Sequence, residues 1–267
     1  MNTREEIIDA LSGKDIHSSP PAVFTQTGTI GQMDHCDSSW PEAIFKANKM
    51  AELSLQLHRQ FGFATAKVPF CITVEAEALG CVLGDSSRDR QPAVVSSPYR
   101  DQDGIPDVPD LPSPAEYSET GRLPVVREAA GIVMKNEDVF TIGGCVDPAT
   151  ATMQLLGADD YLVGTLIEPE SCRKWIRALT PLMTEELKQL SETVDDVQII
   201  AMADSNLTTN SEFDTMVGEP VGHMISVAES LTTIHSCGDT KPILGKLSSL
   251  GENGLSVETS DDPEGIF

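Results

Sequence analysis

Residues 232–239 read Thr-Thr-Ile-His-Ser-Cys-Gly-Asp, an apolar run that ends in a His-x-Cys pair and a glycine. In a β-strand, residues two apart point to the same face. His235 and Cys237 therefore aim an imidazole and a thiol at one point, at the carboxyl end of a strand. Parallel α/β folds build their sites at this end of the strands. The stretch predicts such a fold, with a site at the end of this strand.

A metal is one use for this pair. A catalytic zinc site takes three protein ligands and leaves one position open, and zinc would hold Cys237 as a thiolate. The alternative is a buried histidine beside an inert core cysteine. Spacing alone favours that alternative, because a His-x-Cys pair is not specific without partners.

Carboxylates end the predicted strands on both sides of this one. Asp204 ends the run 197–204, and Glu258 ends the run 254–258. In a barrel both would approach the same mouth, Asp204 as a catalytic group and Glu258 as a base or zinc ligand. The alternative for each is a solvated loop acid, the default in a chain with 42 acidic residues.

The ends of the first two predicted strands carry weaker candidates. Gln26 and Thr27 offer amide and hydroxyl donors for a substrate, or form a plain turn. Glu75 and Glu77 lie two residues apart after the second strand. A helix start explains them better than a general acid/base pair does.

Strands and helices alternate along the chain. Apolar runs predict six strands, at 22–26, 64–70, 139–144, 197–204, 232–237 and 254–258. Helical spacing predicts helices at 3–13, 48–59, 124–135, 148–156, 161–167, 170–191, 213–230 and 241–250. This order is typical of a parallel α/β architecture. Six steps suit a TIM-like (β/α)8 barrel lacking its last two β/α units, since each unit needs roughly 30 residues.

The domain prediction is one domain over residues 1–267, incomplete at its C-terminal end. Residues 84–124 break the periodicity and are rich in Asp, Pro, Ser and Arg. Such a length is long for a plain connection, so we expect an irregular excursion or lid.

The charge balance excludes some partners. The chain has 42 Asp and Glu against 18 Lys and Arg, a net charge of -24. Such a surface repels nucleic acid and anionic membranes. No GxGxxG or Walker sequence supports nucleotide binding. The charge fits either a protein kept soluble in high salt or an ordinary acidic cytosolic protein.

Cysteine usage and the N-terminus indicate a reducing compartment. The six cysteines form no CxxC pair, and the first residues lack the features of a signal peptide. No run of about 18 apolar residues predicts a membrane span. We therefore expect a cytoplasmic protein with free thiols. An open sheet edge after the sixth strand would also favour self-association.

Several stretches along the chain form a recognisable series. They are residues 2–6 (NTREE), 10–14 (ALSGK), 26–29 (QTGT), 40–43 (WPEA), 68–81 (VPFCITVEAEALGC), 201–204 (AMAD) and 235–238 (HSCG). In this order, and over essentially the whole chain, they resemble the methylcobalamin:coenzyme M methyltransferase branch of the uroporphyrinogen decarboxylase-like superfamily. The opening helix alone is not specific, whereas 68–81 together with 235–238 is.

The resemblance implies a zinc enzyme on a TIM-like barrel. Zinc would bind the thiol of coenzyme M, and the thiolate would take a methyl group from the corrinoid of a separate methylated protein, the methylcobalamin carrier, in methanogenesis. The family's ligands imply His235 and Cys237 as zinc ligands, with Glu258 at a position that fills the open site. Because zinc would lower the pKa of the bound thiol, that thiol would be a strong nucleophile.

The chain also departs from the family. The family has a second ligating cysteine late in the barrel, and no cysteine follows Cys237 here. A non-catalytic, truncated barrel that binds a corrinoid protein or a paralogue is therefore an alternative. A metal-free decarboxylase-like enzyme is another, but decarboxylase members need arginines near the first strand end, and residues 15–58 contain none.

Overall fold

The computed structural model describes residues 3–16, 19–25, 28–100 and 104–258. Its centre is a five-stranded sheet in the order β1-β4-β5-β6-β7, in which every neighbouring pair is parallel. The strands are β1 (Thr65–Val68), β4 (Phe140–Val146), β5 (Asp196–Ile200), β6 (Leu231–Ser236) and β7 (Gly254–Val257). The predicted α/β class with parallel strands in chain order, as in part of a barrel, is confirmed.

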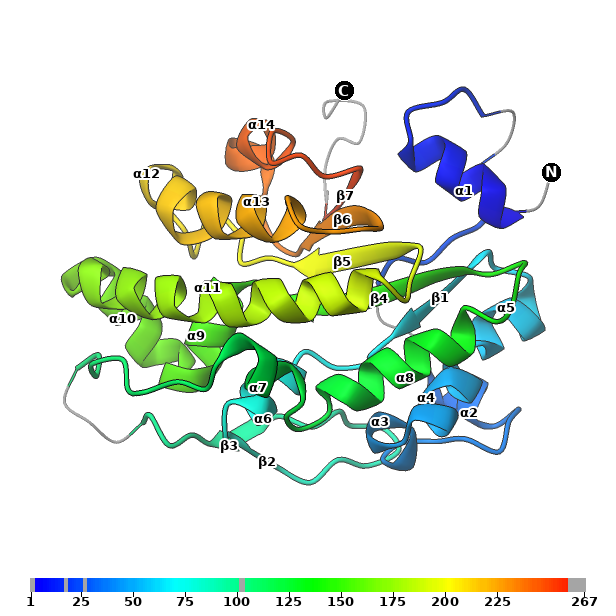
Figure 1. The fold of residues 1–267 in the computed structure, drawn as a ribbon, viewed down its shortest axis with the longest axis horizontal. Helices are drawn as coiled ribbons and strands as arrows, with labels where there is room; N and C mark the ends of the chain where they lie inside the picture. Colours follow the sequence, from blue (N-terminus) through cyan, green and yellow to red (C-terminus); the bar gives the residue numbers. More distant parts are fainter. Residues whose placement is uncertain (1–2, 17–18, 26–27, 101–103, 259–267) are drawn as a thin grey trace.

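Helices cover the outer face of this sheet. In Figure 1, α8, α11 and α13 run side by side across it, and α4 packs beside α8. The helices are α1 (Thr3–Leu11), α2 (Ile30–Met33), α3 (Glu42–Phe45), α4 (Ala47–Ser54), α5 (Gln56–Phe61), α6 (Val74–Ala78), α7 (Pro114–Ser118), α8 (Leu123–Val133), α9 (Pro148–Leu156), α10 (Ala158–Ile167), α11 (Pro169–Ser191), α12 (Asn210–Phe213), α13 (Glu219–Ile225) and α14 (Leu244–Leu247).

The strands divide their side chains between two layers. On β5, Val197 and Ile199 face the helix layer and join its apolar core, whereas Asp196 and Gln198 point into the barrel. The outer layer is tight at Gly143, where a Cβ atom would lie 2.8 Å from Leu190 of α11. Alternation therefore places polar side chains inside the barrel, below the strand ends.

Apolar side chains close the barrel beneath this polar layer. Phe140 and Ile142 of β4 form a buried cluster with Ile7 of α1, and Phe24 packs against it. The Phe24 and Phe140 rings lie 6.1 Å apart. This cluster separates the interior polar groups from the lower end of the sheet.

The prediction of a strand at 22–26 is wrong for its described part. Residues 22–24 run beside β1 without a strand ladder. The Thr65 hydroxyl takes the place of that ladder, because it donates to the Val23 carbonyl at 3.0 Å and accepts from the Val23 amide at 2.8 Å. Pro20 and Pro21 lack the N–H groups that pairing would need.

Three predicted helices are not continuous α-helices in the structure. The helix expected over 48–59 is divided at Leu55 into α4 and α5. The helix expected over 213–230 contains a π-helical turn, η1 (Asp214–Gly218), between α12 and α13, and ends at Ile225. The helix expected over 241–250 begins as a 3-10 turn, η2 (Lys241–Ile243). By contrast, the long helix predicted over 170–191 is confirmed as α11.

Residues 84–124 have little regular structure where they are described. Strand β3 (Val94–Ser96) pairs antiparallel with β2 (Val82–Leu83), and α7 follows. Trp175 of α11 donates from Nε1 to the Pro106 carbonyl at 2.8 Å, and its ring meets Tyr99 with centroids 5.1 Å apart. The segment is thus fastened to the long helix.

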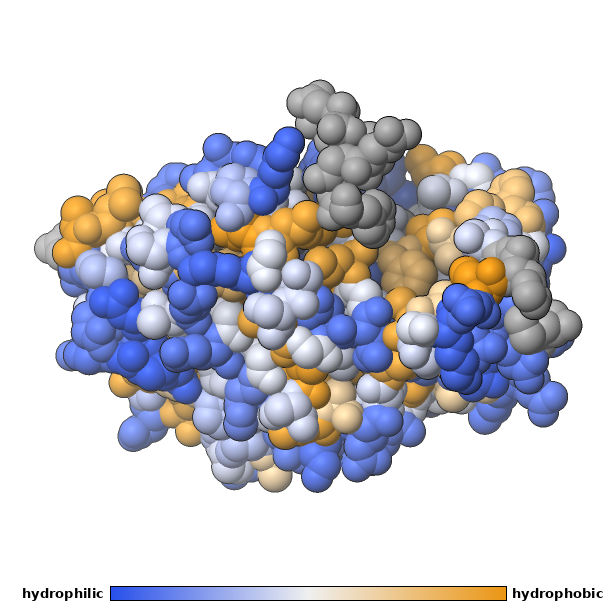
Figure 2. Space-filling view, turned by 90° about the horizontal axis from the view of Figure 1, so that it is seen from above, coloured by the Kyte–Doolittle hydropathy of each residue, from blue (hydrophilic) through white to orange (hydrophobic). Residues whose placement is uncertain are grey.

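The surface is largely hydrophilic. Figure 2 shows polar residues over most of the upper face, with apolar residues gathered at the left end, where Figure 1 places α10. Val163, Leu166 and Ile167 of α10 are among the exposed large apolar residues. Among the described residues, no helix has both the length and the apolar character that crossing a bilayer requires.

Candidate functional site

The carboxyl end of β6 brings His235 and Cys237 together. His235 Nε2 lies 3.2 Å from Cys237 Sγ, and His235 Nδ1 lies 3.0 Å from the Ser256 hydroxyl of β7. The parallel register sets His235 directly opposite Ser256 and Ile200. When Nδ1 carries the proton and donates to Ser256, the lone pair of Nε2 faces the thiol.

The turn after Cys237 brings the two predicted carboxylates to the same place. Gly238 has φ of +83°, and a Cβ atom there would lie 2.2 Å from Asp204 Oδ2. The Gly238 amide donates to Glu258 Oε2 at 2.9 Å. The other carboxylate oxygen of Asp204 accepts from the Asn206 amide at 2.9 Å. Both acids therefore flank the His-x-Cys-Gly turn, in contact with its glycine.

His235, Cys237 and Glu258 line a pocket of about 670 Å³ at the carboxyl ends of the strands, whereas Asp204 is not among its lining residues. Its volume suits a small substrate. The lining residues are Thr25, Lys67, Ile72, Ile200, His235, Cys237, Ser256, Val257 and Glu258. The predicted substrate residues Gln26 and Thr27 lie outside the described residues.

Lys67 lines the pocket, and the buried Gln198 lies beneath it in contact with Lys67. The sequence interpretation missed both residues. Lys67 is 2% exposed, and its Nζ donates to Gln198 Oε1 and to the Phe24 carbonyl at 3.3 Å. Burial lowers the pKa of Lys67 to about 8, against the opposing effect of Asp196. The sequence feature that could have pointed to them is a lysine and a glutamine on the barrel-facing side of two otherwise apolar strands.

Electrostatics favour a neutral His235. Burial, followed by the positive charge of Lys67, lowers the pKa of His235 below its ordinary value. Neutral imidazole is the form that binds metal. The same pocket therefore offers one neutral nitrogen donor beside a thiol.

Glu75 and Glu77 do not form a pair. They belong to α6, as the helix interpretation predicted. Glu75 is buried and accepts from the Val146 amide at 2.9 Å, whereas Glu77 forms an ion pair with Arg122. Burial raises the pKa of Glu75 to about 7.

The donors present fit a zinc ion in part. Tetrahedral zinc, at about 2.0 Å from nitrogen and 2.3 Å from sulfur, would hold the two atoms roughly 3.5 Å apart. The observed 3.2 Å between His235 Nε2 and Cys237 Sγ is close to this. Within the described ranges, however, no three His, Cys, Asp or Glu side chains are grouped to hold a metal.

A model of the uroporphyrinogen decarboxylase (URO-D) family matches residues 2–266. The chain belongs to the URO-D family. Its URO-D relatives include methylcobamide:CoM methyltransferase MtaA of Methanosarcina barkeri, 29% identical over 96% of this chain and 75% of that protein. Methylcobamide:CoM methyltransferase MtbA of Methanosarcina mazei is 28% identical over 97% of this chain and 77% of the relative.

A solved URO-D-like structure agrees with these relatives. A methyltransferase from Methanosarcina mazei superposes on this chain with a TM-score of 0.88 and is 28% identical in sequence. The match covers 96% of this chain and 76% of the methyltransferase chain. The predicted resemblance to the methyltransferase branch of the URO-D superfamily is confirmed. The expected enzyme type, a methyltransferase, agrees with the names of these relatives.

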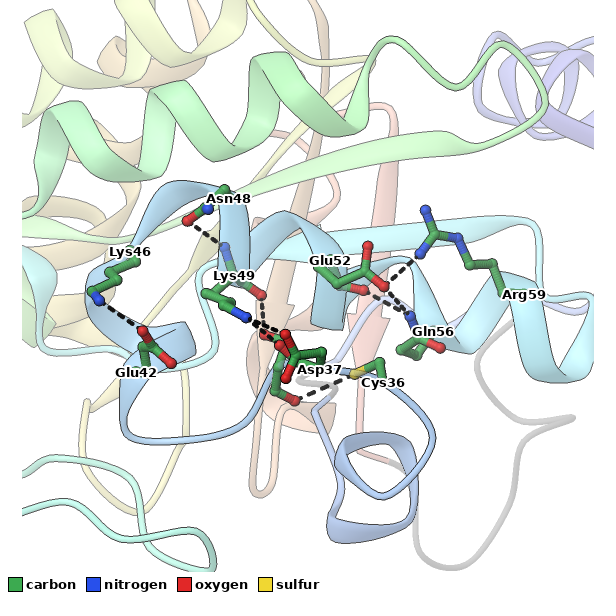
Figure 3. Close-up of polar contacts among 10 residues, drawn as sticks. Cys36, Asp37, Glu42, Lys46, Asn48, Lys49, Glu52, Gln56 and Arg59 are labelled. Atoms are coloured by element: carbon green, nitrogen blue, oxygen red, sulfur yellow. Dashed lines mark hydrogen bonds and ion pairs between the residues drawn. The ribbon is translucent and has the colours of Figure 1, made fainter.

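The region before β1 offers no free cations for an acidic porphyrin among its described residues. Figure 3 shows the polar contacts around α3, α4 and α5. Lys46 pairs with Glu42, Lys49 with Asp37, and Arg59 with Glu52. These cations are already paired with carboxylates of the chain.

Proposed function

We propose that this URO-D protein transfers a methyl group from the corrinoid of a methylated partner protein to the thiol of coenzyme M in methanogenesis, with zinc as cofactor. The observation that carries this is the convergence of His235 and Cys237 in the pocket, 3.2 Å apart. The similarity to methylcobamide:CoM methyltransferases supports the choice of substrates. The free thiols of all six cysteines support a reducing, cytoplasmic setting.

His235 and Cys237 would hold the zinc ion, with Glu258 as third or exchangeable ligand. Zinc, when bound, lowers the pKa of a thiol so that it is a thiolate at neutral pH. Ser256 orients the imidazole through Nδ1, in the manner of an outer-shell partner. Asp204 and Glu258 hold the turn at Gly238 and so fix the direction of Cys237.

The reaction needs a substrate sulfur at the pocket and a methyl donor at its mouth. The sulfur forms a bond to the methyl carbon, and the carbon–cobalt bond breaks with its electron pair left on the partner's corrinoid. The thiol proton leaves before this step. We assign Asp204 and Glu258 as the catalytic carboxylates, one of which accepts this proton as a general base, because both border the turn beside Cys237.

Zinc analysis and a methyl-transfer assay test the proposal together. We expect His235→Ala and Cys237→Ala to lose zinc, and methyl transfer from methylcobalamin to coenzyme M to fall by at least about 100-fold. His223→Ala is the matched control, because His223 is exposed on α13, far from the pocket lining. Equal zinc in wild type and His235→Ala would contradict the assignment.

A further inference from the structure

Two buried polar side chains meet inside the barrel below the His-Cys pair. Lys67 comes from β1 and Gln198 from β5, and their residues are 2% and 0% exposed. Lys67 Nζ donates to Gln198 Oε1. Gly144 of β4 makes room for this contact, because a Cβ atom there would lie 3.0 Å from Lys67 Cε. The sequence of three neighbouring strands thus builds one polar floor.

Some hydrogen-bond donors of this floor have no acceptor among the described residues. An ammonium has three donors, and toward the described residues Lys67 uses two of them, on Gln198 Oε1 and on the Phe24 carbonyl. An ammonium group only donates hydrogen bonds, so Lys67 binds the amide oxygen of Gln198. The Gln198 NH2 group therefore points away from Lys67. Its Nε2 is buried and finds no acceptor among the described residues. Buried donors without acceptors cost free energy, so such a group indicates a missing acceptor.

The charge on Lys67 also lacks an ionic contact within the part of the chain that the structure describes. Both of its described acceptors are neutral oxygens. The nearby acid Asp196 accepts instead from the Thr233 hydroxyl at 2.7 Å. Asp196 therefore acts on Lys67 only through its charge at longer range. This charge raises the pKa of Lys67, whereas burial lowers it. A buried cation surrounded by neutral acceptors favours a bound anion.

The strand register sets the distance from this floor to the His-Cys pair. Gln198 lies opposite Thr233, and His235 follows two residues later on the same face of β6. Two residues of strand correspond to about 6.6 Å. Lys67, His235 and Cys237 line the same pocket. A thiol joined by two carbon atoms to an acidic group has this order of length.

We propose that Lys67 and Gln198 form the anion subsite of this pocket, which binds the sulfonate of a short thiol-sulfonate while its sulfur lies at His235 and Cys237. This rests on the proposed function, since it names how the thiol substrate is recognised. The sulfonate is ionised at every working pH and offers three acceptor oxygens for the free donors. With the anion at the floor, the sulfur faces the mouth, where a methyl donor would approach.

Substrate preference tests the subsite. 2-Mercaptoethanol has the same carbon chain as coenzyme M but a hydroxyl in place of the sulfonate. We expect Lys67→Met to lower the ratio of kcat/KM for coenzyme M to kcat/KM for 2-mercaptoethanol by at least about tenfold, because a charged hydrogen bond is lost. Gln198→Glu should lower the same ratio, because its carboxylate would form an ion pair with Lys67 and repel an anion. Lys14→Met, at an exposed surface ion pair with Asp9, is the control.

Binding of ethanesulfonate gives a second measurement that needs no activity. It has the acid but no thiol, so it probes the subsite even if the methyl-transfer proposal fails. We expect calorimetry to show binding to wild type and to Lys14→Met, and at least about tenfold weaker binding to the Lys67 and Gln198 variants. An unchanged preference and unchanged ethanesulfonate binding in a folded Gln198→Glu would overturn the subsite. Loss of methyl transfer with binding retained would overturn only the proposed function.

Discussion

At the scale of single residues, Gly238 decides the geometry of the site. Its φ of +83° belongs to the left-handed region, and its missing side chain leaves room for the Asp204 carboxylate. We predict that Gly238→Ala lowers the free energy of unfolding by about 1–3 kcal/mol, because a methyl group would meet Asp204 Oδ2 in a strained backbone. It should also lower zinc content, because Cys237 precedes the displaced turn.

The control for this substitution is another glycine. Gly245 of α14 has nothing within 4 Å of its Cβ position and no positive φ. Gly245→Ala should stabilise the protein by up to about 1 kcal/mol through helix propensity. Urea denaturation of both variants checks the pair. The prediction fails if the two alanines shift the midpoint equally.

The sequence predicted part of the site at this scale. The spacing of His235 and Cys237 indicated their shared direction, because alternation along a strand is local. The predicted strand ends also placed Asp204 and Glu258 near the same turn, although β5 ends at Ile200 and Asp204 lies in the loop that follows. Lys67 and Gln198 could not be paired in advance, because their contact joins strands 131 residues apart and depends on the space at Gly144.

At the scale of elements, α11 holds the segment 84–124 through Trp175. We predict that Trp175→Phe lowers the free energy of unfolding by about 1–3 kcal/mol, because the Pro106 carbonyl loses its indole donor. It should also speed cleavage within 84–124 in limited proteolysis. Lys174→Ala, at the exposed neighbouring position on α11, is the control. Equal cleavage rates in both variants would argue against this anchoring role.

Elements with strong local patterns were predictable, and weakly patterned ones were not. The amphipathic face of α11 and the buried run of β5 each carry their own signal. The segment 22–24 also has an apolar run, yet its partner Thr65 supplies a side-chain hydroxyl where a ladder was expected. The π-helical turn η1 lies between α12 and α13 and has a different hydrogen-bond spacing, which a 3.6-residue apolar period does not reveal.

At the scale of the whole molecule, buried carboxyls set the pH dependence of stability. Burial raises the pKa of four of them: Glu75 to about 7, Asp147 to about 6, Glu186 to about 8 and Asp196 to about 7. Between the unfolded and folded pKa values, the folded state binds more protons than the unfolded state. Raising the pH from 5.5 to 8 should therefore lower the free energy of unfolding, by a few kcal/mol as an order of magnitude.

Urea denaturation across this pH range checks the slope. Glu75→Gln keeps an acceptor for the Val146 amide but cannot ionise, so its curve should be flatter. Glu128→Gln, at an exposed position of α8, should keep the wild-type slope. The lowered pKa of His235 and, near pH 8, that of Lys67 act in the opposite direction, as two groups against four. Stability that rises steadily over this range would contradict the prediction.

Strand β7 has a consequence for how the site persists over time. In the described sheet it pairs with β6 alone, and its four residues are all partly exposed. It nevertheless supplies Ser256 to His235, and Glu258 follows it to meet Gly238. A local opening of this strand would release both contacts while the helix layer stays folded. The lifetime of the assembled site is therefore set by local opening of β7 at the edge of the sheet. On heating, the protein would lose activity at a lower temperature than that of global unfolding.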